Sequence, residues 1–441
     1  IFPEDREQLN SPSVYRGSTR RGREFNLKFN MNKLVSHPSS SLPRTTFIII
    51  GIDDNAQQEL PEQARNAIAG GFVFSGGKRH HEIMRKYLPD NHLWIDITVP
   101  LDDVFRQYEA HSDIVVFASG DPLFFGFANT VRKRLPDAEI SVIPTFNSLQ
   151  TLAHRLLLPY HDMHIVSLTG RPWHEFDRAL IEGQEKIGVL TDREHTPTSI
   201  AKRMLEYGYD NYIIHTGEEL GSSTETVRTQ SIAEAQATCF RHPNCLILER
   251  TYVRPRPFGI PESEFELLDG RVNMITKAPI RLLSLAQLDL RSRHTLWDIG
   301  FCTGSVSIEA KLQFPHVKIA AFEQRPEGER LMKLNSMRFG TPGIITRIGN
   351  FLQAELDDLP APDAVFIGGH GGQMDEIIRR VSEHLLPGGV IVFNSVSEQS
   401  RELFINAVKH HGLTLAATQH VTIDDHNPIL IMKAQKRSSY E

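Results

Sequence analysis

Short runs of apolar and β-branched residues alternate with segments of helical periodicity from Thr46 onward. Runs of this length are typical of buried strands, and the helical segments between them supply the crossovers that parallel strands need. The pattern therefore predicts an α/β protein. Pro61 and Gly71 bracket a helix expected between the first strands. In the first half we expect strands at 46–51, 113–118, 139–143, 163–168, 186–191 and 211–216.

The pattern of residues along the chain changes near Val253. Residues 254–265 (RPRPFGIPESEF) carry three prolines and a glycine, which break helices and remove strand donors. We therefore predict a linker over 253–265 between a domain at 46–252 and a second α/β domain at 266–441. No internal repeat relates the two, so two different folds are joined. In the second domain we expect strands at 294–300, 317–323, 344–349, 363–369 and 389–395, helices at 305–314 and 325–340, and a closing antiparallel pair at 411–423 and 428–434.

Composition narrows the class of protein. A chain of 441 residues is too long for one core, and 40% apolar with 23% charged residues is ordinary for a soluble globular protein. The net charge is −6, so the chain lacks the overall excess of positive charge that favours binding to nucleic acid. Three cysteines make no disulfide framework, and no apolar run is long enough to span a bilayer. We expect a cytoplasmic protein with no nucleic-acid or membrane partner.

The first 45 residues differ from the rest. They begin at Ile1, are rich in Arg, Ser and Asn, and lack the apolar stretch of a secretory signal. We expect a mobile extension, a fragment boundary or upstream translated sequence outside the fold. A basic tail that binds an acidic partner is the alternative.

A glycine-bearing loop follows the first strand of the second domain, in the segment DIGFCTGSVSIE (298–309). Gly300 and Gly304 allow the backbone to approach a ligand closely. Glu323 ends the next strand, where a carboxylate accepts ribose hydroxyls in dinucleotide sites. Asp298 can accept from an ammonium group or order the loop. An incidental glycine turn is the alternative, but the acidic strand end favours a nucleotide-type ligand.

This loop resembles that of Rossmann-like class I S-adenosyl-L-methionine methyltransferases, with Cys302 at the middle glycine of D-x-G-x-G-x-G. The finer resemblance is to the decarboxylating methyltransferase module of corrin biosynthesis. It is carried by segments 273–281, 296–310, 322–327, 348–356, 366–372 and 385–394. The resemblance implies contacts to the cofactor from Thr276, from Asp298 and the loop residues Gly300, Phe301, Cys302, Thr303 and Gly304, from Glu323 to the ribose, and from Asn350 and Phe351 to the adenine.

The segment FIGGHGG (366–372) is the most distinctive piece of this resemblance. Its glycines leave room for a large flat substrate, and His370 is the titratable group beside it. We take His370 as the candidate catalytic residue. The alternative is a histidine that is merely exposed to solvent.

In the first domain the loop ASGDPLFFG (118–126) follows a buried strand. Asp121 before Pro122 suits a sharp turn, and we expect Pro122 to occupy the first position of the following helix. The backbone of such a turn can bind the carboxylate and amine of a ligand.

With its companions this loop resembles the tetrapyrrole methylase family over residues 46–250. The companion segments are 76–82, 144–159, 166–172, 189–197 and 215–227. The resemblance implies a class III fold of two αβα subdomains with the cofactor in the cleft between them. One departure is GIDDN (51–55), where the family has G-x-G-P-G. The implied cofactor contacts are Ser119, Gly120, Asp121, Pro122, Leu123, Asn147, Ser148, Leu168, Gly170, Gly217 and Glu218.

The His-His pairs at 80–81 and 410–411 suggest a metal site at first sight. Adjacent side chains point in different directions, and no Cys or carboxylate spacing completes a ligand set. We therefore expect no metal.

Together the two resemblances imply S-adenosyl-L-methionine-dependent methylation of a corrin precursor, cobalt-bound or metal-free, at carbons 5 and 15. They also imply loss of the ring C acetate carboxyl and a homo-oligomer. Two alternatives remain open from the residues. One is a class III and class I methyltransferase fusion that acts on RNA or protein. The other is a tetrapyrrole-binding protein whose N-terminal half is inactive.

Overall fold

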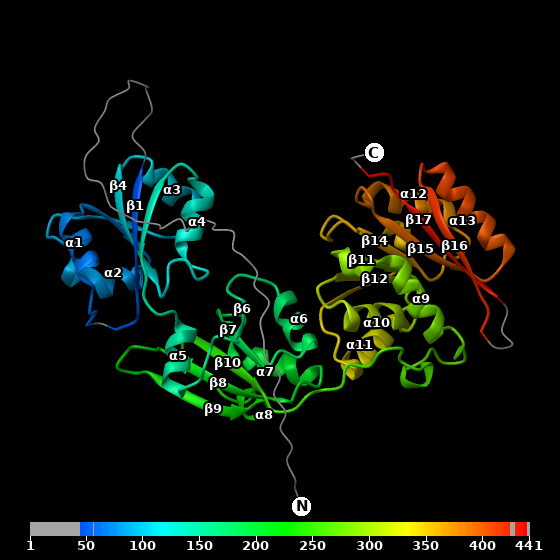
Figure 1. Cartoon of the computed structure of the whole chain (residues 1–441), viewed down its shortest axis with the longest axis horizontal. Coiled ribbons are helices and arrows are strands. Elements are labelled where there is room, and N and C mark those ends of the chain that lie inside the picture. The colour runs from blue at the N-terminus through cyan, green and yellow to red at the C-terminus, as the bar shows by residue number, and fades with distance from the viewer. Residues whose placement is uncertain (1–44, 56, 424–427, 439–441) are drawn as a thin grey trace, which may run out of the picture. The chain divides into compact units, whose positions relative to one another are not determined.

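The computed structural model describes residues 45–55, 57–423 and 428–438 (Figure 1). The predicted extension over 1–45 lies outside these residues except for Thr45. The described strands form three sheets, two of them before the predicted linker and one after it. This arrangement confirms an α/β fold with two subdomains followed by a separate sheet. Among the described residues, no helix has the length and apolar content that crossing a membrane requires.

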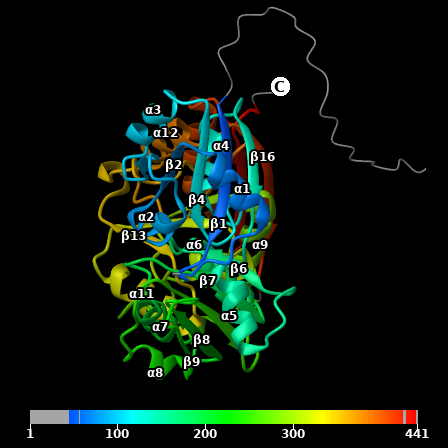
Figure 2. The ribbon, with the colours of Figure 1, turned by 90° about the vertical axis from the view of Figure 1, so that its left-hand side faces the viewer.

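The first sheet is parallel, with the strand order β3-β2-β4-β1-β5. Figure 2 shows β1 beside β4, and their register pairs Ile52 with Ser119, so the loops after both strands leave the same edge. The strands are β1 (Thr46–Ile52), β2 (Val73–Gly76), β3 (Leu93–Asp96), β4 (Asp113–Ser119) and β5 (Glu139–Ile143). The helices are α1 (Glu62–Gly70), α2 (Lys78–Met84) with the short η1 (Arg85–Tyr87), α3 (Asp102–Tyr108) and α4 (Phe127–Arg134).

The expectation that Pro122 begins a helix is wrong. Helix α4 starts at Phe127, and the residues between form turns. The side chain of Asp121 accepts a hydrogen bond from the N–H of Leu123 at 2.8 Å. An aspartate that binds the backbone two residues on diverts the chain into a turn, which delays the helix.

The second sheet is mixed, with the order β6-β7-β10-β8-β9. Only β6 and β7 are parallel, whereas β10 is antiparallel to both β7 and β8, and β9 to β8. The sequence pattern had not indicated β9 or β10; β9 is largely polar and lies at an edge, where no apolar run is needed. The strands are β6 (His164–Ser167), β7 (Lys186–Leu190), β8 (Tyr212–Glu218), β9 (Thr226–Ser231) and β10 (Asn244–Arg250), and the helices are α5 (Ser148–Leu156), α6 (His174–Glu182), α7 (Pro197–Glu206) and α8 (Ile232–Ala235).

The third sheet has seven strands in the order β13-β12-β11-β14-β15-β17-β16. The first five are parallel, and β17 is antiparallel to β15 and β16, which confirms the predicted closing pair. The strands are β11 (Thr295–Ile299), β12 (Lys318–Glu323), β13 (Ile344–Ile348), β14 (Ala364–Ile367), β15 (Val390–Ser395), β16 (Thr414–Val421) and β17 (Ile429–Gln435). The helices are α9 (Ala278–Leu288), α10 (Ser305–Gln313), α11 (Glu327–Phe339), α12 (Met374–His384) and α13 (Glu398–His410), with short turns η3 (Leu290–Ser292) and η4 (Phe351–Gln353).

The predicted linker carries one short helical turn, η2 (Glu262–Glu264), and is attached to α10 through Glu309. The Glu309 carboxylate accepts from the N–H groups of Gly259 at 2.8 Å and Ile260 at 3.1 Å. It also pairs with Arg281 at 3.2 Å, and both side chains are fully buried. Arg281 in turn donates to the carbonyl of Thr276 at 2.8 Å. This ion pair therefore holds the segment that enters α9 in place.

Candidate active sites

A cavity of about 1170 Å³ opens at the carboxyl ends of β11, β12 and β14. Ligands of open parallel sheets bind at this edge, because the loops that follow the strands meet there. The residues predicted from sequence that line the cavity are Thr276, Gly300, Phe301, Cys302, Glu323, Asn350, Phe351 and His370.

The glycine loop after β11 is tightly packed. Gly300 has a φ of +78°, and a Cβ on it would lie 2.8 Å from the backbone nitrogen of Gly369. Gly304 also has a φ of +78°, and its Cβ would meet the sulfur of Met332 at 2.6 Å. Both positions therefore require glycine. Cys302 is left-handed as well, with a φ of +52°, so this cysteine adopts a backbone conformation that favours glycine.

Glu323 closes the loop from the neighbouring strand. One carboxylate oxygen accepts from the N–H of Cys302 at 2.8 Å, and the other accepts from the N–H of Arg325 at 3.0 Å. The Arg325 guanidinium lies 3.0 Å from the same carboxylate. A carboxylate has about four lone-pair sites, and these three donors leave about one of them for a hydroxyl group in the cavity.

Asp298 is not one of the residues that line the cavity, and it is fully buried. One oxygen accepts from the hydroxyl of Ser307 at 2.6 Å, while the other has no partner. Burial raises the pKa of Asp298 to about 7. Of the two roles expected for Asp298, this geometry favours ordering the loop. Thr303 and Gly304 likewise lie behind the residues that line the cavity.

Asn350 and Phe351 begin η4 at the cavity wall. The Asn350 side-chain oxygen accepts from the N–H of Leu352 at 3.0 Å, so it already serves as a cap. Phe351 packs edge-on against Phe322 at a centroid distance of 5.0 Å and is only 6% exposed. The adenine contacts predicted for Asn350 and Phe351 stay predictions. The ring of Phe351 packs mostly within the core.

His370 lines the same cavity. Its Nδ1 accepts from the N–H of Gly372 at 3.1 Å, which leaves the proton on Nε2, 3.3 Å from the hydroxyl of Ser400. Burial lowers the pKa of His370. The ring is therefore neutral near pH 7 and oriented by two contacts. This arrangement suits a positioning role better than that of a strong base.

Sequence reasoning missed two cations of the cavity wall, Lys277 and Arg325. Both lie inside the segments quoted for the resemblance, but a surface lysine or arginine has no sequence signal of its own. Both residues line the cavity, and Arg325 also pairs with Glu323.

In the first domain, two loops meet at the carboxyl edge of the first sheet. A Cβ on Gly51 would lie 2.3 Å from the carbonyl oxygen of Gly120. Gly120 has a φ of +60° and lies against Asn147, whose Cα is 3.1 Å from the position of an added Cβ. Asn147 caps α5 by accepting from the N–H of Gln150 at 2.9 Å. The structure thus brings Gly120 next to Asn147, two of the residues whose cofactor contacts were predicted.

Ser119 is held by two residues of α2. The Oγ of Ser119 accepts from Arg79 at 3.2 Å and contacts Nε2 of His80 at 2.8 Å. Burial lowers the pKa of His80 to about 4, and Nδ1 accepts from the N–H of Gly77, so Nε2 carries the proton. The Ser119 hydroxyl therefore retains its own hydrogen for a ligand.

The carboxylates of the GIDDN segment are engaged by the protein. Asp54 pairs with Arg79 at 3.0 Å, and its pKa is raised, mainly by burial. Asp53 accepts from the N–H of Asn55 at 2.9 Å. The extra negative charge is therefore partly neutralised by Arg79.

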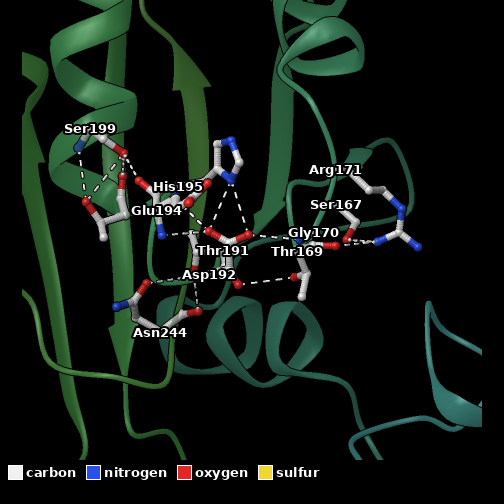
Figure 3. Close-up of polar contacts among 11 residues, drawn as sticks. Ser167, Thr169, Gly170, Arg171, Thr191, Asp192, Glu194, His195, Ser199 and Asn244 are labelled. Atoms are coloured by element: carbon white, nitrogen blue, oxygen red, sulfur yellow. Dashed lines mark hydrogen bonds and ion pairs between the residues drawn. The ribbon is translucent and has the colours of Figure 1, made fainter. Parts of the chain in front are cut away.

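Figure 3 shows how the loops after β6 and β7 are joined through Asp192. Its carboxylate accepts from the N–H groups of Gly170 at 2.9 Å and His195 at 2.7 Å. Although burial raises the pKa of Asp192, the hydrogen bonds from His195 and Gly170 outweigh it and lower the pKa. Asp192 thus positions Gly170, and only its place in the quoted segment 189–197 could have indicated this.

Other residues predicted to contact the cofactor, in and next to the second sheet, are less accessible to a ligand. Leu168 is fully buried, and Gly217 lies inside β8 with Leu220 packed on it. Glu218 accepts from Arg228 at 2.8 Å and from the N–H of Arg241 at 2.7 Å. Because the Glu218 side chain is also fully buried, any ligand contact from Glu218 has to come from its backbone.

The two His-His pairs differ. His80 contacts Ser119, whereas His81 stacks on Trp94, so these neighbours point in different directions as expected. For His410 and His411 the expectation is wrong, because both rings contact one carboxylate oxygen. Helix α13 ends at His410, and His411 leaves the helical backbone.

Comparison with known proteins agrees with this arrangement. A family profile described as tetrapyrrole (corrin/porphyrin) methylases matches residues 46–236, and one described as a precorrin methyltransferase domain matches 268–435. The precorrin-6Y C(5,15)-methyltransferase [decarboxylating] of Sinorhizobium sp is 31% identical over 86% of this chain and 90% of its own. The chain belongs to this family. It is therefore a decarboxylating C-methyltransferase, which confirms the class predicted from the two resemblances.

Two further relatives match about two fifths of this chain. The cobalt-precorrin-6B C(15)-methyltransferase (decarboxylating) of Salmonella typhimurium is 32% identical over 39% of this chain and 95% of its own. A crystal structure titled as the precorrin-6Y C5,15-methyltransferase of Geobacter metallireducens is 34% identical, with a TM-score of 0.38, over 42% of this chain and 100% of that one. Family membership favours a tetrapyrrole substrate over RNA or protein.

Proposed function

We propose that this family member methylates a corrin precursor, precorrin-6Y or its cobalt form, at carbons 5 and 15 and removes the ring C acetate carboxyl. Each domain uses S-adenosyl-L-methionine. The observation that carries the proposal is the cavity of about 1170 Å³ with Gly300, Glu323 and His370 on its wall. Pockets for drug-sized ligands are about 300–1,000 Å³, so this one has room for a nucleoside and part of a second molecule.

The residues of the second domain fit the cofactor. The backbone at Gly300 leaves no room for a side chain, the Glu323 carboxylate keeps about one acceptor position, and Thr276 is held at the wall by Arg281. In the first domain, the Ser119 hydroxyl and the turn at Asp121 would hold it. When bound, the cofactor supplies an electrophilic methyl group on a sulfonium.

The chain's own residues bind and orient the substrate. Lys277 and Arg325 supply positive charge to a cavity that must accept a polycarboxylate. Gly372 and Ser400 hold the neutral ring of His370 in place. His370 acts as a hydrogen-bond donor through Nε2 and not as a base that accepts a proton. The described cavity residues include no strong base, so positioning supplies much of the rate, as it does when reacting groups are held in line.

The decisive assay gives the purified full-length chain a corrin intermediate and isotope-labelled S-adenosyl-L-methionine. Mass spectrometry of the product is expected to register two methyl gains and one loss of carbon dioxide. A substrate whose mass is unchanged would overturn the proposal. The same assay with an RNA or a protein-lysine substrate is expected to give no labelled product.

The inactive-half alternative is tested separately, because GIDDN departs from the family's glycine-rich turn. Calorimetry with S-adenosylhomocysteine is expected to give two equivalents per chain. One equivalent, abolished by a Gly300 substitution, would indicate that the first domain binds no cofactor.

We further infer that the enzyme is a cytoplasmic homo-oligomer. Cys239, Cys245 and Cys302 are all free, which fits a reducing compartment. Transfer of an unstable intermediate between two sites favours assembly. Light scattering of the purified chain tests whether it forms a homo-oligomer. A measured mass equal to that of one chain would contradict this inference.

A further inference from the structure

Three side chains with metal-binding atoms converge where α12 begins and α13 ends. Asp375 lies in the first turn of α12, while His410 ends α13 and His411 follows it. The two helices pack on each other, as Figure 1 shows. Nδ1 of His410 and Nε2 of His411 each lie 3.1 Å from the same oxygen of Asp375, and the three ligand atoms all lie within 4.8 Å of one another.

Two of these separations are close to those between the ligands of a small tetrahedral ion. Ligands about 2.0–2.1 Å from Zn²⁺ stand about 3.4 Å apart at tetrahedral angles. The two observed distances of 3.1 Å differ from that value by a few tenths of an ångström. Small side-chain rotations would bring both of these pairs to the spacing of zinc ligands, and the third pair lies within 4.8 Å. Two imidazoles and a carboxylate are also a donor set that Zn²⁺ and similar divalent ions accept.

The surroundings support a three-ligand site with one open position. The side chain of His411 is only 13% exposed, so its ring is held by the protein, whereas His410 and Asp375 are 71% and 51% exposed. Solvent can therefore supply a fourth ligand. The backbone explains the convergence, because His411 adopts φ −97° and ψ 22° where the helix stops, which brings its ring to the same side as that of His410.

We propose that Asp375, His410 and His411 form a site for one divalent transition-metal ion of the Zn²⁺ class, with water as the fourth ligand. This site is separate from the proposed methyl transfer and does not depend on it. An ion there fastens the end of α13 to the start of α12. Since Asp375 follows closely after the cavity loop that carries His370, the ion also restrains that loop.

The test uses the full-length chain after treatment with a chelator. Calorimetric titration with ZnCl₂ compares the wild type with Asp375→Asn, His410→Gln and His411→Gln. Each variant is expected to lose one equivalent of Zn²⁺ or to bind it at least about 10-fold more weakly, since even residues outside the ligand shell change metal affinity by 10–100-fold. The comparison between variants matters because the chain has 20 histidines, and weak binding at other histidines would be the same in every variant.

Glu376→Gln is the matched control, because it removes the same charge from the neighbouring exposed position of α12. It is expected to retain the wild-type stoichiometry. Co²⁺ provides a second measurement: the wild type is expected to develop the visible absorption of a four-coordinate site, and the three variants are not. Circular dichroism checks that each variant is folded. If the three variants bind Zn²⁺ as the wild type and Glu376→Gln do, the contacts are hydrogen bonds only and the proposal is wrong.

Discussion

Replacing Gly300 by alanine is expected to slow the decarboxylating reaction of the second domain and to spare the methylation by the first. Gly300 has a φ of +78°, and a left-handed non-glycine residue costs about 1–2 kcal/mol. The added Cβ also lies 2.8 Å from the nitrogen of Gly369, and ordinary contact begins at 3.4 Å. The two loops would therefore have to separate by about 0.6 Å, starting from 2.8 Å and ending at 3.4 Å.

That displacement falls on the wall of the cavity, because Gly300 and Gly369 both line it. A shift of about 1 Å can cost about 100-fold in rate when reacting groups must be aligned. We therefore expect Gly300→Ala to lose about 10–100-fold in carboxyl loss and carbon-15 methylation, with carbon-5 methylation unchanged. Mass spectrometry of the product distinguishes the two, because only the second-domain reaction releases carbon dioxide.

Gly388→Ala is the control for backbone strain. Gly388 has a similar φ of +73°, but a Cβ there meets nothing within 4 Å, and it does not line the cavity. It is expected to lose stability without losing decarboxylation. Equal activity in the two variants would refute the steric argument, and equal loss of both methylations in a folded Gly300→Ala would refute separate sites.

Three further changes test other parts of the argument. Gly51→Ala places a Cβ 2.3 Å from the carbonyl oxygen of Gly120, so it is expected to abolish carbon-5 methylation and retain carbon dioxide release in the same assay. The pKa of Asp298 is raised to about 7 by burial, above about 4 in the unfolded chain, so the stability that it contributes is present below pH 4 and lost as the pH rises through 7. Urea unfolding of Asp298→Asn is expected to depend less on pH between about 4 and about 7 than that of the wild type. An identical dependence would contradict the buried location. Arg281→Met leaves the buried Glu309 carboxylate without its cation, so the free energy of unfolding is expected to fall by about 3–5 kcal/mol in a urea titration. A loss below about 1 kcal/mol would show that the fold does not depend on this ion pair.

The strands of the sheets were largely predictable because their signal is local. Runs such as 113–118 and 317–323 are apolar over the length of a strand, and the structure has β4 and β12 there. The edge strand β9 was not predictable, since its polar residues follow no apolar alternation and its place depends on pairing with β8. The start of α4 was mispredicted because a side-chain hydrogen bond from Asp121 competes with helix formation.

The sequence by itself determined the family, the glycine loops and the acidic end of β12, because these are short patterns whose chemistry does not depend on distant residues. Only the tertiary structure decided which predicted residues face the cavity. Asp298 proved to be buried behind its loop, and the oxygens of Glu218 are taken by arginines. The meeting of His410 and His411 with Asp375 likewise depends on how two helices pack. Burial and contacts between residues far apart in the chain are set by packing, and no local pattern encodes them.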